Sequence, residues 1–168
     1  MAEIAGAQMK LGNVTRATPE ERLLEPGFEL LPVHDTAGDF VAHMQIGSII
    51  HASGTLPWIN GGPRFAGLIG GTLAAGQGYA AFQLLALNGL SLLKSITGDL
   101  SKIKRIHRVE GAGGATADFH DVPRALSGAS HLATRVFGEK GAHLRMIHSN
   151  LSMPTSCAAL VISWTEVE

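Results

Sequence analysis

The chain has 168 residues, of which 45% are hydrophobic and 16% are charged, and its formal net charge is -1. A chain of this length and composition can build one domain of ordinary size around an apolar core. The balance of charges leaves no basic excess to hold phosphates, so a nucleic acid is not expected as a partner.

The N-terminal region is expected to begin as an arm. Residues 1–17 show no clear periodicity, and one domain is expected to follow over residues 18–168. Thr18-Pro19-Glu20-Glu21 combines an N-cap residue, a proline at the first helical position and a glutamate three residues after the cap. This pattern predicts a short helix that ends near Glu25, before Pro26-Gly27.

The middle of the chain predicts a hairpin, a loop and a long helix. Residues 40–54 are rich in strand formers on both sides of Gly47-Ser48, which indicates a hairpin. A loop follows from Thr55 to Thr72, and loops of that length in compact domains are usually functional or mobile. Apolar residues at helical spacing predict a helix from Leu73 to Thr97, which Gly98 ends.

The second half of the chain predicts three strands and one helix. In chain order these are a strand over Ile103–Glu110, a glycine-rich connection over Gly111–Phe119, a helix over about Val122–Val136, and strands over Leu144–Ser152 and Ala158–Val167. The chain is therefore of the α/β or α+β class, with two helices covering one face of a sheet. The other face also needs a cover, and a second copy of the chain is the simplest one.

Cysteine content and hydropathy bear on the compartment. The single cysteine, Cys157, excludes an intramolecular disulfide and a cysteine-based zinc cluster, and it favours a reduced, cytoplasmic compartment. Met1–Gly12 has neither the basic start nor the apolar block of a signal peptide. Polar residues such as Asn88 and Lys94 interrupt the apolar stretch around Leu84–Leu93, so no membrane segment is expected.

Motifs in a specific order run through the chain after residue 17. They are Ile50–Pro57, Lys104–Gly111, Asp118–Pro123, Val136–Gly141, and Arg145 ahead of Met153-Pro154. In order and spacing these motifs resemble the Rid/YjgF family of reactive-intermediate (enamine and imine) deaminases. The capped helix near the N-terminus is similar to the one that precedes the domain in the longer subgroup of that family.

The resemblance implies a fold, an assembly and a reaction. The fold would be chorismate-mutase-like, a β-sheet packed on two helices, and three copies would form a homotrimer with an inner barrel and a ligand cleft at each subunit interface. Members of the family commonly hydrolyse 2-imino or enamino acids to 2-oxo acids and ammonia. They use neither a metal nor an organic cofactor. The implied partner is thus a small-molecule carboxylate ligand.

Arg145 is the residue on which the functional prediction depends. An always-charged guanidinium on an otherwise neutral strand is costly to bury, so it needs an anionic partner or ligand. Arg145 stands at the position where the family that this chain resembles has an arginine. In that family the arginine clamps the substrate carboxylate through two parallel charge-assisted hydrogen bonds. An ion pair at a subunit interface is the alternative interpretation.

The resemblance also places other residues in the substrate-binding cleft. Phe40 stands where the family usually has a tyrosine that lines the cleft, and Gly54 stands where a backbone group meets the ligand. Ser127 stands where an asparagine is common, and Ile147 where short members often carry a cysteine.

One position departs from the family pattern in a way that affects the chemistry. Leu160 stands where the deaminases place a glutamate that positions or activates water. Leucine cannot exchange a proton, and loss of one acid or base typically lowers a rate by ~10²–10⁴-fold. His51 shares strand parity with Ser53, so both are candidates to face the cleft, and His51 could replace the missing base. A packed strand histidine is the alternative.

Three functional hypotheses follow. The default is hydrolytic deamination of a small carboxylate that bears an imine, enamine or related conjugated group. A variant is another conversion in a more apolar cleft, such as tautomerisation or cyclisation. The third is a non-catalytic trimer that binds a small acid, because binding needs Arg145 and not a proton shuttle. No metal is expected, since the histidines show no pair with zinc-ligand spacing on a recognisable scaffold.

Overall fold

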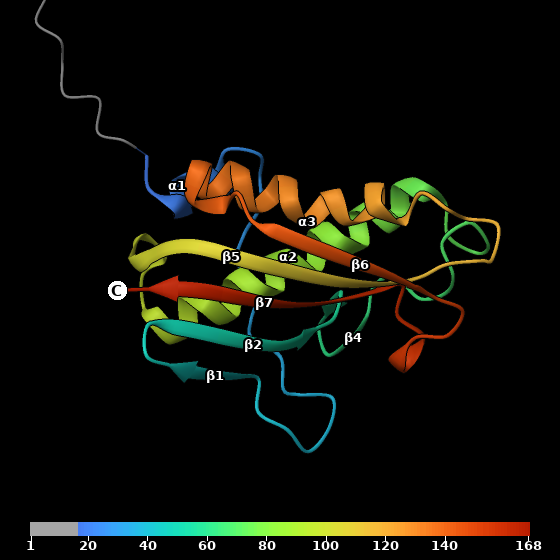
Figure 1. Ribbon diagram of the computed structural model, residues 1–168, viewed down its shortest axis with the longest axis horizontal. Helices are drawn as coiled ribbons and strands as arrows, with labels where there is room; N and C mark the ends of the chain where they lie inside the picture. The colour runs from blue at the N-terminus through green and yellow to red at the C-terminus, as the bar shows by residue number, and fades with distance from the viewer. Residues whose placement is uncertain (1–16) are drawn as a thin grey trace, which may run out of the picture.

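The computed structural model describes residues 17–168 (Figure 1). The expected arm, residues 1–17, lies outside this part of the chain except for Ala17. The helices are α1 (Pro19–Leu24), α2 (Ala75–Thr97) and α3 (Val122–Phe137), with single 3-10 turns at Leu100–Lys102, Gly138–Gly141 and Pro154–Ser156. The strands are β1 (His43–Ile46), β2 (Ile49–Thr55), β3 (Trp58–Ile59), β4 (Gly62–Pro63), β5 (Ile103–Gly114), β6 (Leu144–Asn150) and β7 (Ala159–Val167).

Five strands form one sheet in the order β1-β2-β7-β5-β6, so β1 and β6 are its edges. Strands β5 and β6 are parallel, and the other neighbours are antiparallel. Figure 1 shows α2 and α3 on the same side of this sheet, with β1 and β6 at opposite edges. The main elements follow the order that the sequence predicts.

The glycine-rich segment after Glu110 was predicted wrongly as a connection. Its first four residues, Gly111–Gly114, continue strand β5. Two of the glycines are required by close packing, because a Cβ atom on Gly111 would lie 2.8 Å from Ile147 Cδ1, and one on Gly113 would lie 2.6 Å from Val122 Cγ1. The glycines thus let β6 and α3 approach the strand instead of ending it.

The predicted loop from Thr55 to Thr72 contains a small hairpin of its own, formed by β3 and β4. The amide group of Asn88 in α2 holds the start of this segment, since its Nδ2 donates to the carbonyl oxygens of Leu56 (2.9 Å) and Trp58 (3.0 Å). A side chain from the helix therefore fixes the chain where it leaves β2.

Helix α1 has the predicted cap. The Glu21 amide donates to Thr18 Oγ1 (3.2 Å), and the Thr18 amide donates to the Glu21 carboxylate (2.7 Å). Glu20 ties α1 to the end of α2 by accepting from Lys94 Nζ (2.7 Å) and from the Leu100 amide (3.0 Å). Burial would raise the pKa of Glu20, but these hydrogen bonds outweigh it, so the pKa lies below its ordinary value of 4.5.

The two long helices pack closely on each other and on the sheet. A Cβ atom on Gly128 of α3 would clash with the carbonyl oxygen of Tyr79 in α2, so glycine permits the close approach of the helix backbones. By length and composition α2 could cross a membrane, but core helices of globular proteins share both properties, and 44% of its apolar stretch is buried. Here α2 packs against α3 and the sheet.

The face of the sheet opposite the helices has no cover from residues 17–168. Strand register places the side chains of the edge residues Met44, Ile46, Leu144 and Met146 on this face. They are 60%, 63%, 71% and 45% exposed, respectively. Large apolar side chains on an open sheet face indicate an interaction surface.

Candidate functional site

Arg145 lies on edge strand β6 beside helix α3. Its side chain is exposed, and its Nη1 donates to Ser127 Oγ at 3.2 Å. Ser127 in turn donates to the Pro123 carbonyl oxygen at 3.4 Å. Within residues 17–168 no carboxylate forms an ion pair with Arg145. A neutral hydroxyl leaves the positive charge uncompensated, so the guanidinium can accept an anion.

Ile147 is two residues beyond Arg145 on the same face of β6. It is half-buried and lines a shallow surface hollow together with His120 and Ser149. Arg145, Ser127 and Ile147 are called the β6 half of the candidate site.

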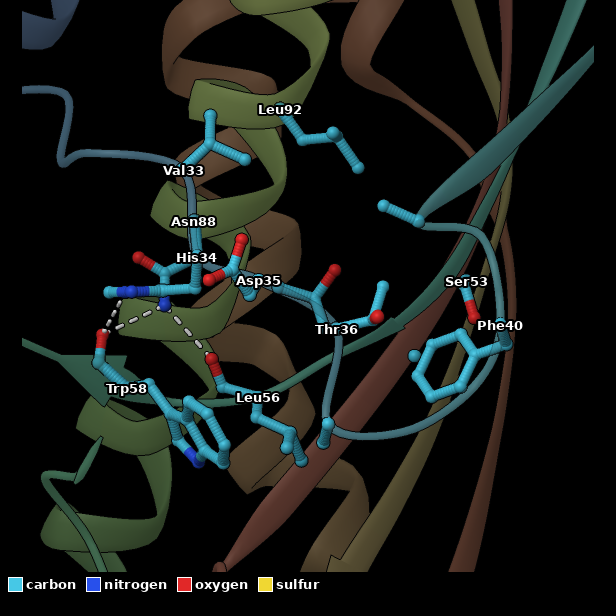
Figure 2. Close-up of a pocket in the computed structure, with 14 residues that line it drawn as sticks. Val33, His34, Asp35, Thr36, Phe40, Ser53, Leu56, Trp58, Asn88 and Leu92 are labelled. Atoms are coloured by element: carbon cyan, nitrogen blue, oxygen red, sulfur yellow. Dashed lines mark hydrogen bonds between the residues drawn. The ribbon is translucent and has the colours of Figure 1, made fainter. Parts of the chain in front are cut away.

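Phe40, Ser53 and Gly54 line one cavity near β2, as Figure 2 shows for the labelled Phe40 and Ser53. Leu160 of β7 stands against the same segment, because a Cβ atom on Gly54 would lie 3.0 Å from Leu160 Cδ1. These four residues are called the β2 half of the candidate site. The structure thus brings together four predicted site residues that are up to 120 positions apart in the sequence.

His51 does not line the cavity that Ser53 lines. Its imidazole packs edge-on against the Trp164 ring on the uncovered face of the sheet, with ring centroids 6.1 Å apart. The pairing of β2 with β7 shifts register between Ala52 and Thr55. Such an irregularity re-aims the residues after it. The contact with Trp164 fits a packed strand histidine, the alternative interpretation of His51, and the catalytic role stays a prediction.

The two halves cannot meet within one chain. Strands β7 and β5 separate β2 from β6, and three inter-strand steps place the two strands about 14 Å apart. The β6 half also faces the helices, whereas Leu160 belongs to the opposite face of β7. A ligand that touches both halves would need a second copy of the chain, with the β6 edge of one copy beside the β2 edge of the other.

Comparison with known proteins identifies the group to which this geometry belongs. A family described as "YjgF/chorismate_mutase-like, putative endoribonuclease" matches residues 20–167. The chain belongs to the Rid/YjgF family. "Protein TCP17" of Trypanosoma cruzi is 29% identical over 142 residues, which cover 84% of this chain and 89% of that protein.

Two solved structures of Rid/YjgF-like proteins agree with the fold. A protein from Shewanella oneidensis titled "putative endoribonuclease" is 38% identical, with a TM-score of 0.87, and the match covers 90% of this chain and 100% of that one. Atu1372 from Agrobacterium tumefaciens, of unknown function, is 30% identical, with a TM-score of 0.82, over 90% of this chain and 94% of that one. The predicted family and its chorismate-mutase-like α+β fold are confirmed.

Sequence reasoning missed most of the β2-side cavity. Besides the predicted residues, its lining includes residues from the segment before β1, from the chain just after β2 and from α2, namely Val33, His34, Asp35, Leu56, Trp58, Asn88 and Leu92. The one available signal was the pair of polar residues, Asn88 and Ser91, inside an otherwise apolar helix. A polar side chain on a buried helix face must find a partner, and these two hold neighbouring segments.

Metal ligation has no support in the part of the chain that the structure describes. No three histidine, cysteine, aspartate or glutamate side chains gather there closely enough to hold an ion. The groups with displaced pKa values among residues 17–168, which are Glu20, Lys94 and Asp99, all lie at the α1 end of the helices. The candidate site therefore consists of one cation, an apolar cavity and the ionisable groups beside it.

Proposed function

We propose that the protein is a Rid-type enzyme that hydrolyses a small carboxylate bearing an imine or enamine group to a 2-oxo acid and ammonia. The observation that carries this proposal is Arg145, an exposed guanidinium on a family motif whose described partner is a neutral hydroxyl. Such a fork can hold a carboxylate by two charge-assisted hydrogen bonds. Cys157, the one cysteine, fits a reduced cytoplasmic setting.

The active unit in this proposal is a homotrimer. The split between the β6 half and the β2 half requires a partner copy, and the contact joins two different edges of the sheet. A contact between different surfaces is heterologous and closes into a ring when the rotation permits. The exposed apolar side chains on the open face of the sheet would be covered inside that ring.

Proton transfer needs a group that replaces the glutamate absent at Leu160. Two ionisable side chains, His34 and Asp35, line the β2-side cavity. His34 Nε2 is engaged with the Trp58 carbonyl oxygen at 3.1 Å, which leaves Asp35, an exposed carboxylate, as the better candidate. In this scheme Asp35 accepts a proton from water as the oxygen adds to the imine carbon. That proton passes to the nitrogen to give a carbinolamine. The carbinolamine hydroxyl then transfers its proton to the same nitrogen as the C–N bond breaks, which forms the carbonyl and releases ammonia.

A small molecule is preferred to RNA as the substrate, although relatives carry the name "putative endoribonuclease". The net charge is -1 and the isoelectric point is about 6.7. Nucleic-acid-binding domains usually present a basic patch or stripe that neutralises phosphates.

The test is hydrolysis of freshly generated 2-aminoacrylate, followed as pyruvate and ammonia. The wild-type protein should accelerate release of ammonia, and Arg145→Ala should abolish the acceleration. Arg135→Ala is the matched control, because Arg135 is an exposed cation of α3 outside both halves of the site. Binding of pyruvate without any turnover would favour the non-catalytic alternative. Equal activity of Arg145→Ala and the wild type would overturn the proposal.

A further inference from the structure

The segment from Phe28 to Ala42, here called the strap, contains neither helix nor strand. Figure 2 shows it running beside α2 and then around toward β2. Several hydrogen bonds hold it in place. Among them, the Leu31 amide donates to Ser91 Oγ (3.0 Å), and His34 Nε2 donates to the Trp58 carbonyl oxygen (3.1 Å). The strap is thus a fixed wall, and it encloses a cavity against α2 and the end of β2.

This cavity extends beyond the β2 half into an apolar region formed by Val33, Leu56, Trp58 and Leu92. The indole of Trp58 is held from the far side, since its Nε1 donates to the sulfur of the fully buried Cys157 at 3.2 Å. Its carbonyl oxygen also accepts from Asn88 at 3.0 Å. Trp58 is thus held by Cys157, Asn88 and His34. A side of the cavity that is already held in place needs little reorganisation when a ligand enters.

The charges around the cavity decide which part of a ligand can enter. No lysine or arginine lines it, whereas the carboxylate of Asp35 does. An anionic group placed there would meet a like charge and lose its hydration without a cationic partner. The carboxylate of the ligand must therefore stay with Arg145 of the neighbouring copy, and an uncharged part must occupy the cavity.

We propose that the strap cavity binds the branched aliphatic side chain of the ligand. The cavity has a volume of about 70 Å³, about half of the ~150 Å³ that admits benzene in an engineered core. An isopropyl or isobutyl group suits such a space better than an aromatic ring does. The inference that the ligand carries a carboxylate rests on the proposed function. The preference of the cavity for a branched aliphatic group does not.

The test compares the binding of three 2-oxo acids by calorimetry and by Trp58 fluorescence, in a Trp164→Phe background that removes the other tryptophan. Relative to pyruvate, 4-methyl-2-oxopentanoate adds three carbon atoms. Each buried methylene is worth about fourfold in affinity, so the branched acid should bind up to about 60-fold more tightly than pyruvate. Phenylpyruvate should gain less than the branched acid.

Two substitutions at Leu92 sharpen the comparison. Leu92→Phe fills the cavity and should remove the preference for the branched acid over pyruvate. Leu92→Ala enlarges the cavity and should improve the binding of phenylpyruvate. Leu24→Phe is the control, because Leu24 is a 58% exposed leucine of α1 outside the cavity.

The outcomes separate this inference from the proposed function. Equal affinity of the wild type for pyruvate and the branched acid, together with Arg145-dependent turnover of 2-aminoacrylate, would overturn the inference alone. Binding of the uncharged 4-methyl-2-pentanone with a Trp58 response, but of no 2-oxo acid, would support the cavity and overturn the proposed function. A preference for the branched acid that survives Leu92→Phe would also overturn the inference.

Discussion

A mixture of two inactive variants should regain activity if the site is shared between copies. Arg145→Ala removes the β6 half, and Ser53→Phe blocks the cavity of the β2 half while leaving Arg145 intact. In a 1:1 mixture assembled at random, a site works when one copy supplies Arg145 and its neighbour supplies Ser53. Each condition holds for half of the copies, so about a quarter of the sites should be intact, whatever the number of copies in the ring.

The assay is turnover of 2-aminoacrylate per chain after the two variants are unfolded and refolded together, with circular dichroism to verify folding. The separately refolded variants, mixed afterwards under conditions that prevent subunit exchange, are the control and should stay inactive. Sedimentation of the wild type should give the mass of three chains. If the co-refolded mixture is as inactive as its parents while both variants fold, the site lies within one chain and the argument from opposite sheet edges fails.

Four further substitutions test local parts of the structure. Asp35→Asn should lower kcat by about 10²-fold or more with little change in KM, because it removes proton transfer and leaves the carboxylate clamp; an unchanged kcat would exclude Asp35. Gly89→Ala should raise the free energy of unfolding by about 0.5–1 kcal/mol, since nothing lies within 4 Å of the added Cβ atom. Gly128→Ala, the same change in α3, should lower it, and thermal melts would show whether the signs differ. Glu20→Gln should lower the free energy of unfolding near neutral pH. Because folding lowers the pKa of Glu20 from 4.5, the difference in stability between the wild type and this variant should fade as the pH falls below about 4.5. A difference that stays constant with pH would contradict the ion pair with Lys94.

The parts of this protein that were predictable from sequence are those set by local rules. The cap at Thr18, the helix that ends before Gly98, and the turn at Gly47-Ser48 depend on neighbours within a few residues. The family motif around Arg145 was also readable, because it is a pattern of residue types at a fixed spacing. Its nearest described partner, Ser127, had been assigned to the same cleft from the resemblance.

Predictions based on local rules went wrong where long-range packing decided the outcome. Gly111–Gly114 looked like a loop because glycine disfavours strands, but closely packed neighbours crowd the place of a Cβ atom at each of its three glycines. The alternation along β2 that made both His51 and Ser53 candidates for the cleft is interrupted by an irregularity in the pairing with β7. Neither cause is visible in the chain near those residues.

The sequence by itself determined most of the secondary structure, the family and the identity of the cation, because each depends on residue types at short spacing. The tertiary structure decided where the Arg145 guanidinium lies relative to the other residues of the candidate site. The order β1-β2-β7-β5-β6 puts Arg145 and Gly54 on different sides of two intervening strands, and the strap adds an apolar cavity beside Gly54. Strand order and the path of the strap arise from contacts between residues far apart in the chain, which spacing along the sequence does not encode.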